Sequence, residues 1–409
     1  MGNRWSRIRL GMVIGSMLSL LAVAPVAMGA NQTVAQLADG VVRPSPLLGA
    51  HEAYLPIIRP SNHASNLLQL PNGDLFLFWF SGTEEGHGDV SIAMSRLKHG
   101  ANAWSLPVIV ASNPGRSDQN PVPFFSPDGV LHLYYTAQER LNENTTLIYE
   151  TLSKDQGQTW SEPRQLFTKP GWYDRQHIVI FHDEWLFPFY FMNSGGITHG
   201  AEGNVSAVKL SKDQGQTWST CDVPNSGGLV QMNIVTLSDH NLIAFFRSRF
   251  ADWIYESQSS DGCHWSDPVK TVLPNNNSSI QVTRLKDGHL VIVFNNSQAR
   301  TTRTKTGSAP RGVLSVALSD NDGKTWSWVR DLQAGATPPA YGPGEDFEYS
   351  YPSVIQSADG SIQVSFSFRR ETIKYMTFVE DWIKDGHTVG LFHGSNKEVS
   401  GPNLINCCK

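Results

Sequence analysis

The chain has 409 residues, of which 40% are hydrophobic and 17% are charged, with 35 glycines and 12 tryptophans. This amount of apolar and aromatic material suits a large packed core and excludes a disordered or coiled-coil chain. The formal net charge of −5 provides no overall basic surface for phosphate groups, so we expect no nucleic-acid partner.

The first predicted segment is a signal peptide over residues 1–30. Three arginines among the first nine residues precede an apolar run at residues 11–23, and small residues follow that run. The run is shorter than the ~20 residues that span a bilayer. We therefore expect cleavage near Ala30, no stable membrane insertion afterwards, and a periplasmic or secreted mature protein over residues 31–409.

Six hairpin signals follow along the mature chain. Each joins two apolar, aromatic-rich runs through a short turn, often Asp-Gly or Asn-Gly, which is the strongest local signal for a β-hairpin. The turns centre on Gly73, Gly129, Glu184, His240, Gly288 and Gly360. A hairpin signal that recurs six times along the chain indicates a fold built from repeated units. The pattern predicts an all-β chain that forms a single six-bladed β-propeller domain of four-stranded antiparallel blades.

Two further expectations concern the closure of this ring. Residues 31–58 are predicted to pair with the C-terminal strands and so complete the last blade. A seven-bladed ring would require an unrecognised hairpin in the long interval between Gly288 and Gly360.

A second repeated motif lies between the hairpins. The octapeptide SKDQGQTW occurs twice, ending at Trp160 and at Trp218, and weaker versions end at Trp265 and Trp326. Its Ser and Asp can bind the backbone of a tight Gly-containing turn while the Trp packs between sheets. The motif is therefore expected to hold blades together and to do no chemistry.

Four cysteines are present, and their spacing matches neither a zinc site nor a dense disulfide framework. They allow three pairings, among which we favour Cys221 with Cys263 over pairings that use Cys407 or Cys408. The sequence contains no HExxH, EF-hand or CxxC motif and no Gly-rich phosphate loop. We therefore expect neither a metal site nor a cofactor.

One set of positions in the repeats is polar throughout. In a propeller the innermost strand of each blade begins at the channel mouth, so residues nine or ten positions before each turn should face one cavity. These residues are His63, Asn120, Arg175, Gln231, Ser279 and Tyr351. The set predicts a polar binding site at the centre of the ring.

The motif S-x-D-x-G-x-T-W is the Asp-box, and with six blades the chain resembles the sialidase superfamily, in its secreted bacterial BNR repeat-like branch. The resemblance covers about residues 55–380. It implies that Tyr351, in EYSYPSVIQSADG, is the nucleophile and that Arg247, in LIAFFRSR, and Arg311, in RGVLSVALSDNDGKTW, bind a substrate carboxylate.

The resemblance also implies a general acid on the loop GTEEGHGDVSIAMSR, where Asp89 takes that place. Glu84 and Glu85 share the loop and are alternative proton donors. A carboxyl group is a suitable acid when burial raises its pKa.

Two positions depart from the family pattern. His63 stands where sialidases place the first arginine of their carboxylate-binding triad, and Gln231 stands where they place the glutamate that activates the tyrosine. These departures leave Tyr351 without its usual carboxylate partner and remove one guanidinium from the triad.

The resemblance as a whole predicts a secreted glycoside hydrolase of the exo-α-sialidase type, acting as a monomer on a terminal acidic sugar of a glycan. The pocket would be lined by His63, Gln231, Arg175, His177 and Asn120. The departures also leave open a uronate-directed lyase with His63 or His177 as base and Tyr351 as acid. A third alternative is a glycan-binding propeller without catalysis.

Overall fold

The computed structural model describes residues 1–2, 33–192, 203–299, 307–335 and 348–386. The predicted signal peptide falls almost wholly on residues 3–32, which lie outside this described part, as do Cys407 and Cys408. The fold discussed below belongs to the compact unit that begins at Val34.

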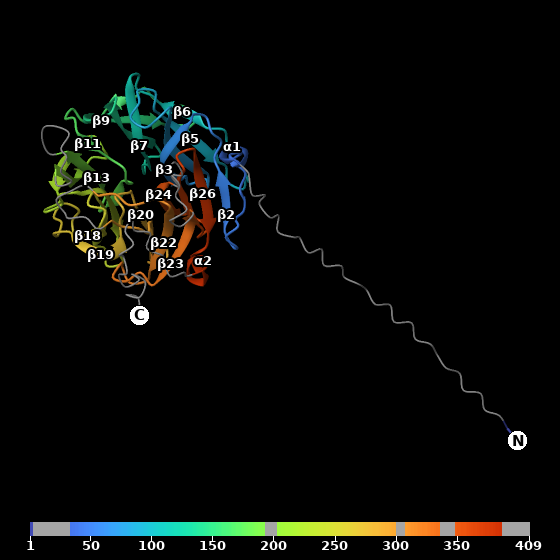
Figure 1. Cartoon of the computed structure of the whole chain (residues 1–409). Helices are drawn as coiled ribbons and strands as arrows, with labels where there is room; N and C mark the ends of the chain where they lie inside the picture. The colour runs from blue at the N-terminus through green and yellow to red at the C-terminus, as the bar shows by residue number, and fades with distance from the viewer. Residues whose placement is uncertain (3–32, 193–202, 300–306, 336–347, 387–409) are drawn as a thin grey trace. The chain divides into compact units, whose positions relative to one another are not determined.

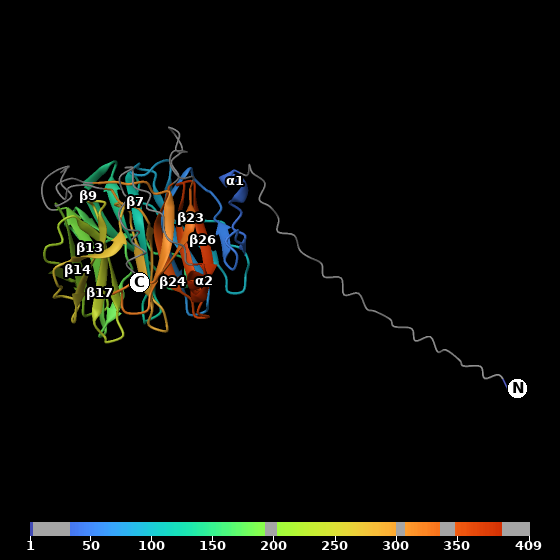
Figure 2. The same cartoon turned by 60° about the horizontal axis from the view of Figure 1, so that its bottom comes forward.

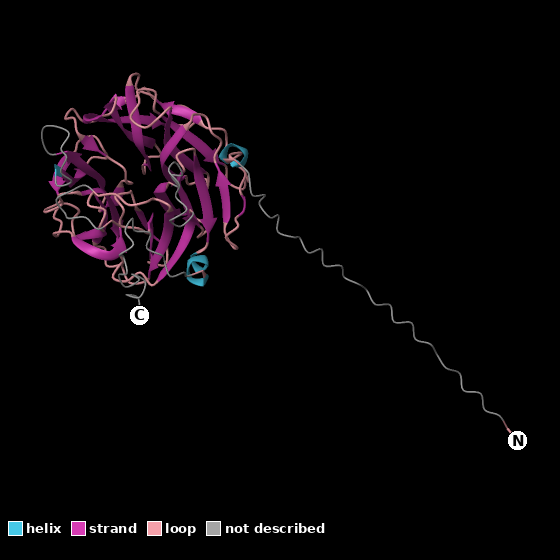
Figure 3. Ribbon diagram, viewed as in Figure 1, coloured by secondary structure: helices cyan, strands magenta, loops and turns pink. Residues whose placement is uncertain are grey.

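The described residues form six antiparallel sheets arranged as blades around a ring (Figures 1 and 3). Each of the first three blades runs outward from the ring centre. Blade 1 contains β3 (Ser61–Gln69), β4 (Leu75–Gly82), β5 (Ser91–Leu97) and β6 (Val108–Ala111). Blade 2 contains β7 (Arg116–Phe125), β8 (Leu131–Glu139), β9 (Asn142–Ser153) and β10 (Arg164–Gln165). Blade 3 contains β11 (Trp172–Tyr173), β12 (Val179–Phe181), β13 (Glu184–Met192), β14 (Asn204–Ser211) and β15 (Ser219–Asp222).

The other three blades complete the ring in chain order. Blade 4 contains β16 (Leu229–Thr236), β17 (Leu242–Ser248), β18 (Trp253–Ser259) and β19 (Val269–Pro274). Blade 5 contains β20 (Gln281–Arg284), β21 (Leu290–Asn295), β22 (Val313–Ser319) and β23 (Trp328–Ala334). Blade 6 contains β24 (Tyr349–Gln356), β25 (Ile362–Phe368), β26 (Thr372–Phe378), β2 (His51–Tyr54) and β1 (Arg43–Pro44).

The predicted six-bladed propeller is confirmed, and no seventh sheet occurs among the described residues. Two blades have five strands where four were expected. In blade 3 the innermost strand is divided into β11 and β12, both of which pair with β13. In blade 6 the short β1 adds to the outer edge of β2.

The ring is closed by the pairing of the first part of the chain with the last. Strand β2 pairs antiparallel with β26, with His51 opposite Thr377 and Tyr54 opposite Lys374, as Figure 1 shows where the blue and red ends meet. The prediction that residues 31–58 complete the last blade is therefore confirmed.

Helices contribute little to the fold. Two short helices are described, α1 (Val34–Leu37) and α2 (Glu380–Asp385). The second packs against β22 and β23 at the rim of the ring (Figure 2). No helix in the part of the chain that the structure covers has the length and hydropathy needed to cross a membrane.

The repeated octapeptides form the tight turns that their composition predicts. In the first copy the Ser153 hydroxyl donates to the Asp155 carboxylate over 2.8 Å and accepts the Gly157 N–H over 2.8 Å. The Thr159 N–H and hydroxyl both donate to the same carboxylate. The Trp160 ring then meets an aromatic ring of blade 1 edge-on, so the motif joins neighbouring blades.

A disulfide joins Cys221 to Cys263, as the sequence favoured. Cys221 lies on β15 of blade 3, and Cys263 lies between β18 and β19 of blade 4. The bond therefore fixes two adjacent blades at their outer strands, away from the ring centre.

Candidate functional site

The innermost strands of four blades carry the same irregularity. Their pairing shifts register between His63 and Asn66, Gln119 and Val122, Val230 and Asn233, and Ser350 and Ser353. At each bulge one residue has a left-handed backbone conformation, and all four lie nine positions before the hairpin turn: Ala64, Asn120, Gln231 and Tyr351, with φ between 50° and 57°. Bulges of this kind re-aim side chains next to functional sites.

The bulges correct one detail of the sequence prediction. The residue of blade 1 that is equivalent to Asn120, Gln231 and Tyr351 is Ala64. His63 precedes it and pairs with Phe80 on β4. His63 still reaches the site, because its imidazole centroid lies 4.3 Å from that of the Tyr351 ring.

Tyr351 is the centre of the site. Its hydroxyl oxygen accepts a hydrogen bond of 2.6 Å from Nη1 of Arg247. Burial would raise the pKa of Tyr351, but the guanidinium groups of Arg247 and Arg311 together hold that pKa below its ordinary value. The Cζ atoms of Arg175, Arg247 and Arg311 lie 5.6, 5.6 and 5.5 Å from the ring centroid. The phenol therefore lies within a cluster of positive charge, which favours its ionised form.

Arg247 is oriented by two amide side chains. Its Nε donates to Oδ1 of Asn277 over 2.9 Å, and its Nη1 also donates to Oε1 of Gln231 over 3.2 Å. Gln231 thus lies in the site as expected, and its amide oxygen binds the arginine beside Tyr351. An amide at this position orients the guanidinium and carries no negative charge that would compete with a bound anion.

His63 is almost fully buried, with 1% of its surface exposed. Neither ring nitrogen has a hydrogen-bond partner within the described part of the chain. Burial lowers the pKa of His63 well below its ordinary value, and the nearby Arg370 adds to this effect. The side chain is therefore a neutral imidazole at neutral pH, with one N–H and one lone pair available to a ligand.

A carboxylate bridges two arginines beside His63. Glu348 accepts from Nη1 of Arg311 over 2.6 Å at one oxygen and from Nε of Arg370 over 2.7 Å at the other. Nη1 of Arg370 also binds Glu85 of the first blade. Burial would raise the pKa of Glu348, but the surrounding positive groups hold it far below its ordinary range, so this carboxylate stays ionised.

Sequence reasoning missed both Glu348 and Arg370. A signal was present, because FRR after the sixth hairpin parallels FFRSR after the fourth, the segment that contains Arg247. The signal is weak because such an arginine reaches the ring centre only when the turn directs it inward, which the sequence does not specify.

Arg175 and His177 lie where the inner strand of blade 3 is interrupted. Nη2 of Arg175 donates to the backbone carbonyls of Ser65, Tyr351 and Pro352, at 2.9, 3.2 and 3.1 Å. Arg175 therefore joins blade 3 to blades 1 and 6 and supports the backbone of Tyr351. Burial, followed by the charge of Arg175, lowers the pKa of His177 to about 4.

The other two predicted residues, Asn120 and Asp89, form their hydrogen bonds with residues other than Tyr351. Nδ2 of Asn120 donates to the Thr136 hydroxyl over 3.4 Å within blade 2. Asp89 is exposed, and its carboxylate accepts the Thr83 hydroxyl at 2.6 Å and the Thr83 N–H at 2.9 Å. These bonds lower the pKa of Asp89. They outweigh the opposing effect of burial, so the pKa of Asp89 is not raised as a general acid would require. Glu85 is the acid of the loop that reaches the arginine cluster.

One cluster of potential metal ligands lies outside this site, at the rim of the ring. It contains Asp287, His289 and Glu380. Nζ of Lys384 binds Glu380 over 2.5 Å, so an internal cation already neutralises the cluster. The arrangement is an ion-pair network on the surface.

The chain matches a known family and is similar in fold to solved structures. A family model described as a BNR repeat-like domain matches residues 73–364. The fold is similar to that of the Hadza microbial sialidase Hz136, with a TM-score of 0.64 and 14% identity over 80% of this chain and 67% of that one. No curated protein matches the chain.

Two further solved structures have the same fold. The NanB sialidase from Streptococcus pneumoniae gives a TM-score of 0.62 and 13% identity over 80% of this chain and 69% of its own. The intramolecular trans-sialidase from Ruminococcus gnavus gives a TM-score of 0.63 and 14% identity over 85% of this chain and 99% of its own. At these identities the likeness establishes the fold, and the chemistry depends on the site.

Proposed function

The chain belongs to the BNR repeat-like family and has the fold of the sialidases, and on this premise we propose that it is a secreted glycoside hydrolase that removes a terminal acidic sugar, such as sialic acid, from glycans. The observation that carries the proposal is the hydrogen bond of 2.6 Å from Arg247 to the Tyr351 hydroxyl, within a cluster of guanidinium groups. Such a cluster suits both an ionised phenol and a bound carboxylate.

In the proposed reaction Tyr351 is the nucleophile or charge stabiliser. Its oxygen forms a bond to the anomeric carbon while the bond from that carbon to the glycosidic oxygen breaks, and water later displaces the tyrosine. Arg247 stabilises the phenolate, which removes the need for a carboxylate base at the position of Gln231. A phenolate within positive charge also avoids the repulsion that a carboxylate nucleophile would meet from the substrate carboxylate.

The glycosidic oxygen must receive a proton as it leaves. We assign this role to the acidic loop of blade 1, with Asp89 as the donor and Glu85 as the alternative. The carboxylate of Asp89 is held by Thr83, whereas that of Glu85 is held by Arg370. Comparing Asp89→Asn with Glu85→Gln on substrates with good and poor leaving groups decides between them, because loss of the acid slows only the poor leaving group.

A uronate-directed lyase is a second candidate because of the state of His63. Its neutral imidazole is buried against Tyr351, and both ring nitrogens lack a partner within the described residues. In a lyase reaction His63 would take the C5 proton, the electron pair would form the new double bond, and Tyr351 would protonate the departing oxygen.

The test is a screen of purified protein against sialosides and uronic-acid glycans, read by reducing sugar and by ultraviolet absorbance. Hydrolysis raises reducing sugar alone, whereas a lyase also creates an absorbing unsaturated product. We expect Tyr351→Phe to lower hydrolysis at least about 100-fold. The matched control is Tyr149→Phe on the outer part of blade 2, with activity like that of the unmodified protein.

Two outcomes would contradict the proposal. Full hydrolysis by both Tyr351→Phe and Asp89→Ala would remove the assigned chemistry from these residues. Glycan affinity without turnover of any substrate would identify a binding propeller.

A further inference from the structure

The geometry points to a further substrate-binding residue: we infer that Arg370, from blade 6, binds the substrate carboxylate together with Arg247 and Arg311. This inference rests on the proposed function, because it assumes an acidic sugar in the same site. It gives the site a third guanidinium in place of the one that the His63 position lacks.

Arg370 binds the same carboxylate as Arg311. Arg311 and Arg370 bind opposite oxygens of Glu348 over 2.6 and 2.7 Å, so one carboxylate holds both guanidinium groups on the same side of the site. A guanidinium has five N–H donors. Arg370 uses Nε for Glu348 and Nη1 for Glu85, and Nη2 has no contact among the described residues. An incoming carboxylate can therefore bind Nη2 without displacing Glu348.

The site also holds more positive than negative side chains. Four guanidinium groups surround the Tyr351 ring and the Glu348 carboxylate, from Arg175, Arg247, Arg311 and Arg370. Within the described part of the chain, Glu348 and Glu85 are the carboxylates that form ion pairs with these arginines. The surplus of two positive charges matches one phenolate and one substrate carboxylate.

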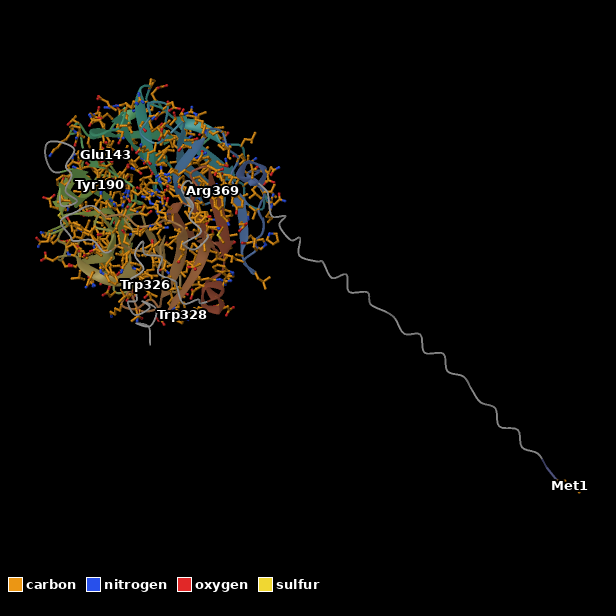
Figure 4. The ribbon with its side chains drawn as sticks, in the orientation of Figure 1. Met1, Glu143, Tyr190, Trp326, Trp328 and Arg369 are labelled. Carbon is orange, nitrogen blue, oxygen red and sulfur yellow. A yellow bond between two sulfur atoms is a disulfide. The ribbon has the colours of Figure 1, made fainter. Side chains whose placement is uncertain are left out.

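The backbone of the turn between β25 and β26 is unusual at Arg370. Arg369 and Arg370 both have left-handed conformations, with φ of 56° and 57°. Paired left-handed residues in a hairpin turn are usually Asn and Gly, so arginines at both positions are strained. Such strain is characteristic of functional sites. It directs Arg370 to the cluster, while Arg369, labelled in Figure 4, is 44% exposed and pairs with Glu371.

Arg369 is therefore a matched control for Arg370. The two residues are adjacent, have the same side chain and the same backbone conformation, and each binds a glutamate. They differ in which side of the turn they occupy. A change at Arg369 removes the same charge as a change at Arg370, but from a side chain that forms its ion pair with Glu371.

The experiment measures binding with two pairs of probes, each pair differing only at the carboxyl group. The first pair is the methyl α-glycoside of N-acetylneuraminic acid and its carboxyl methyl ester, and the second is the methyl glycoside of glucuronic acid and its ester. Calorimetry on the full-length protein gives the affinity ratio of acid to ester. We expect Arg370→Gln to weaken binding of the acid about 10-fold to 100-fold and to change binding of the ester less than about twofold.

Two further variants complete the design. Arg370→Lys keeps the charge but loses the planar fork, so its acid affinity should fall between those of Arg370→Gln and the unmodified protein. Arg369→Gln should leave both affinities unchanged. Unchanged ester binding in every variant shows that the pocket has folded.

The inference is overturned if Arg370→Gln keeps the acid-to-ester ratio of the unmodified protein, if it weakens both probes equally, or if the unmodified protein does not prefer the acid in either pair. Turnover is assayed on the same preparations. Arg370-dependent acid binding without turnover would leave the inference standing and reject the hydrolase. Turnover by the unmodified protein, with an unchanged acid-to-ester affinity ratio in Arg370→Gln, would support the hydrolase and reject the inference about Arg370.

Discussion

At the scale of single residues, the reactivity of the site depends on how Tyr351 is held. A left-handed backbone is costly for a bulky side chain, and the bulge of β24 maintains it. Arg175 also supports this conformation, because it donates to the backbone carbonyls of Tyr351 and Pro352. The bulge and Arg175 thus fix the position of the Tyr351 side chain through its backbone, while Arg247 and Arg311 favour the ionised form of its phenol. Position and ionisation are controlled by different residues, so mutations can separate them.

His177 gives a residue-scale prediction about acid stability. Its pKa is about 4 in the folded chain and about 6.5 when unfolded, so the unfolded state takes up a proton first as the pH falls. The contribution of this group is full above pH 6.5 and declines as the pH falls towards 4. We expect the unmodified protein to lose about 2 kcal/mol more of its unfolding free energy between pH 7.5 and 4.5 than His177→Gln does. Urea unfolding at both pH values measures this difference.

The control for this prediction is His264→Gln, which changes an exposed histidine on the outer part of blade 4. This variant removes an imidazole from an exposed site, where it binds Asp261 over 2.6 Å. Equal acid sensitivity in His177→Gln and His264→Gln would show that His177 is not the group responsible.

At the scale of elements, the Asp-box turns determine how closely adjacent blades approach. Gly157 has a φ of +82°, and a Cβ at this position would lie 3.0 Å from Cζ of Phe76 in blade 1. The equivalent turn of blade 5 is similar, because a Cβ on Gly323 would lie 3.1 Å from Cζ of Phe245 in blade 4. Trp326, labelled in Figure 4, packs edge-on against the same Phe245. These contacts are part of the packing between blades.

The element-scale prediction compares two glycines with the same backbone conformation. Gly157→Ala should destabilise the fold by about 1 kcal/mol through its positive φ and by a further 1–3 kcal/mol through the contact with Phe76. Gly129→Ala should show the first effect alone, since it also has a φ of +85° but no atom lies within 4 Å of its Cβ position. Urea unfolding measures both, and equal losses would reject the proposed packing role.

Features of the molecule that depend on residues close together in sequence could be predicted, and features that depend on an unusual backbone could not. The hairpins and Asp-boxes were predictable because each depends on residues close together in sequence. The pairing of Cys221 with Cys263 was favoured among three possible pairings, and the structure confirms it. The inward position of Arg370 depends on a strained turn that no residue preference indicates. The sequence comparison placed His63 at the repeat position of Asn120, Gln231 and Tyr351, whereas the bulge gives that position to the next residue, Ala64.

At the scale of the whole molecule, the ring is stabilised at its closure by a buried ion pair. Nζ of Lys374 on β26 binds Glu52 of β2 over 2.9 Å, and both side chains are almost fully buried. Lys374 also donates to Gln333 of blade 5, and the Ser45 hydroxyl donates to Glu52. The closure therefore depends on one charge from each end of the ring.

Removing one partner of this ion pair should lower the free energy of unfolding far more than removing both partners. Glu52→Gln should lower the unfolding free energy by about 3–5 kcal/mol, because it leaves the Lys374 ammonium buried without a counter-charge. Adding Lys374→Met should restore most of this loss. The exposed pair of Arg43 and Asp39 provides the control, since Arg43→Gln should cost at most about 1 kcal/mol. Equal unfolding midpoints for Glu52→Gln and Arg43→Gln would contradict the prediction.

The pairing of β2 with β26 also sets an order of events during synthesis. The Thr372 hydroxyl donates to the Leu55 carbonyl across a sequence separation of 317 residues. A ribosome must therefore release nearly the entire polypeptide before the circle can be joined, and until then the sheet edges at both ends are open to other chains. Because the ring closes late, we expect the newly made chain to bind holdase chaperones until closure. A copy truncated before β26 keeps its sheet edges open and should aggregate.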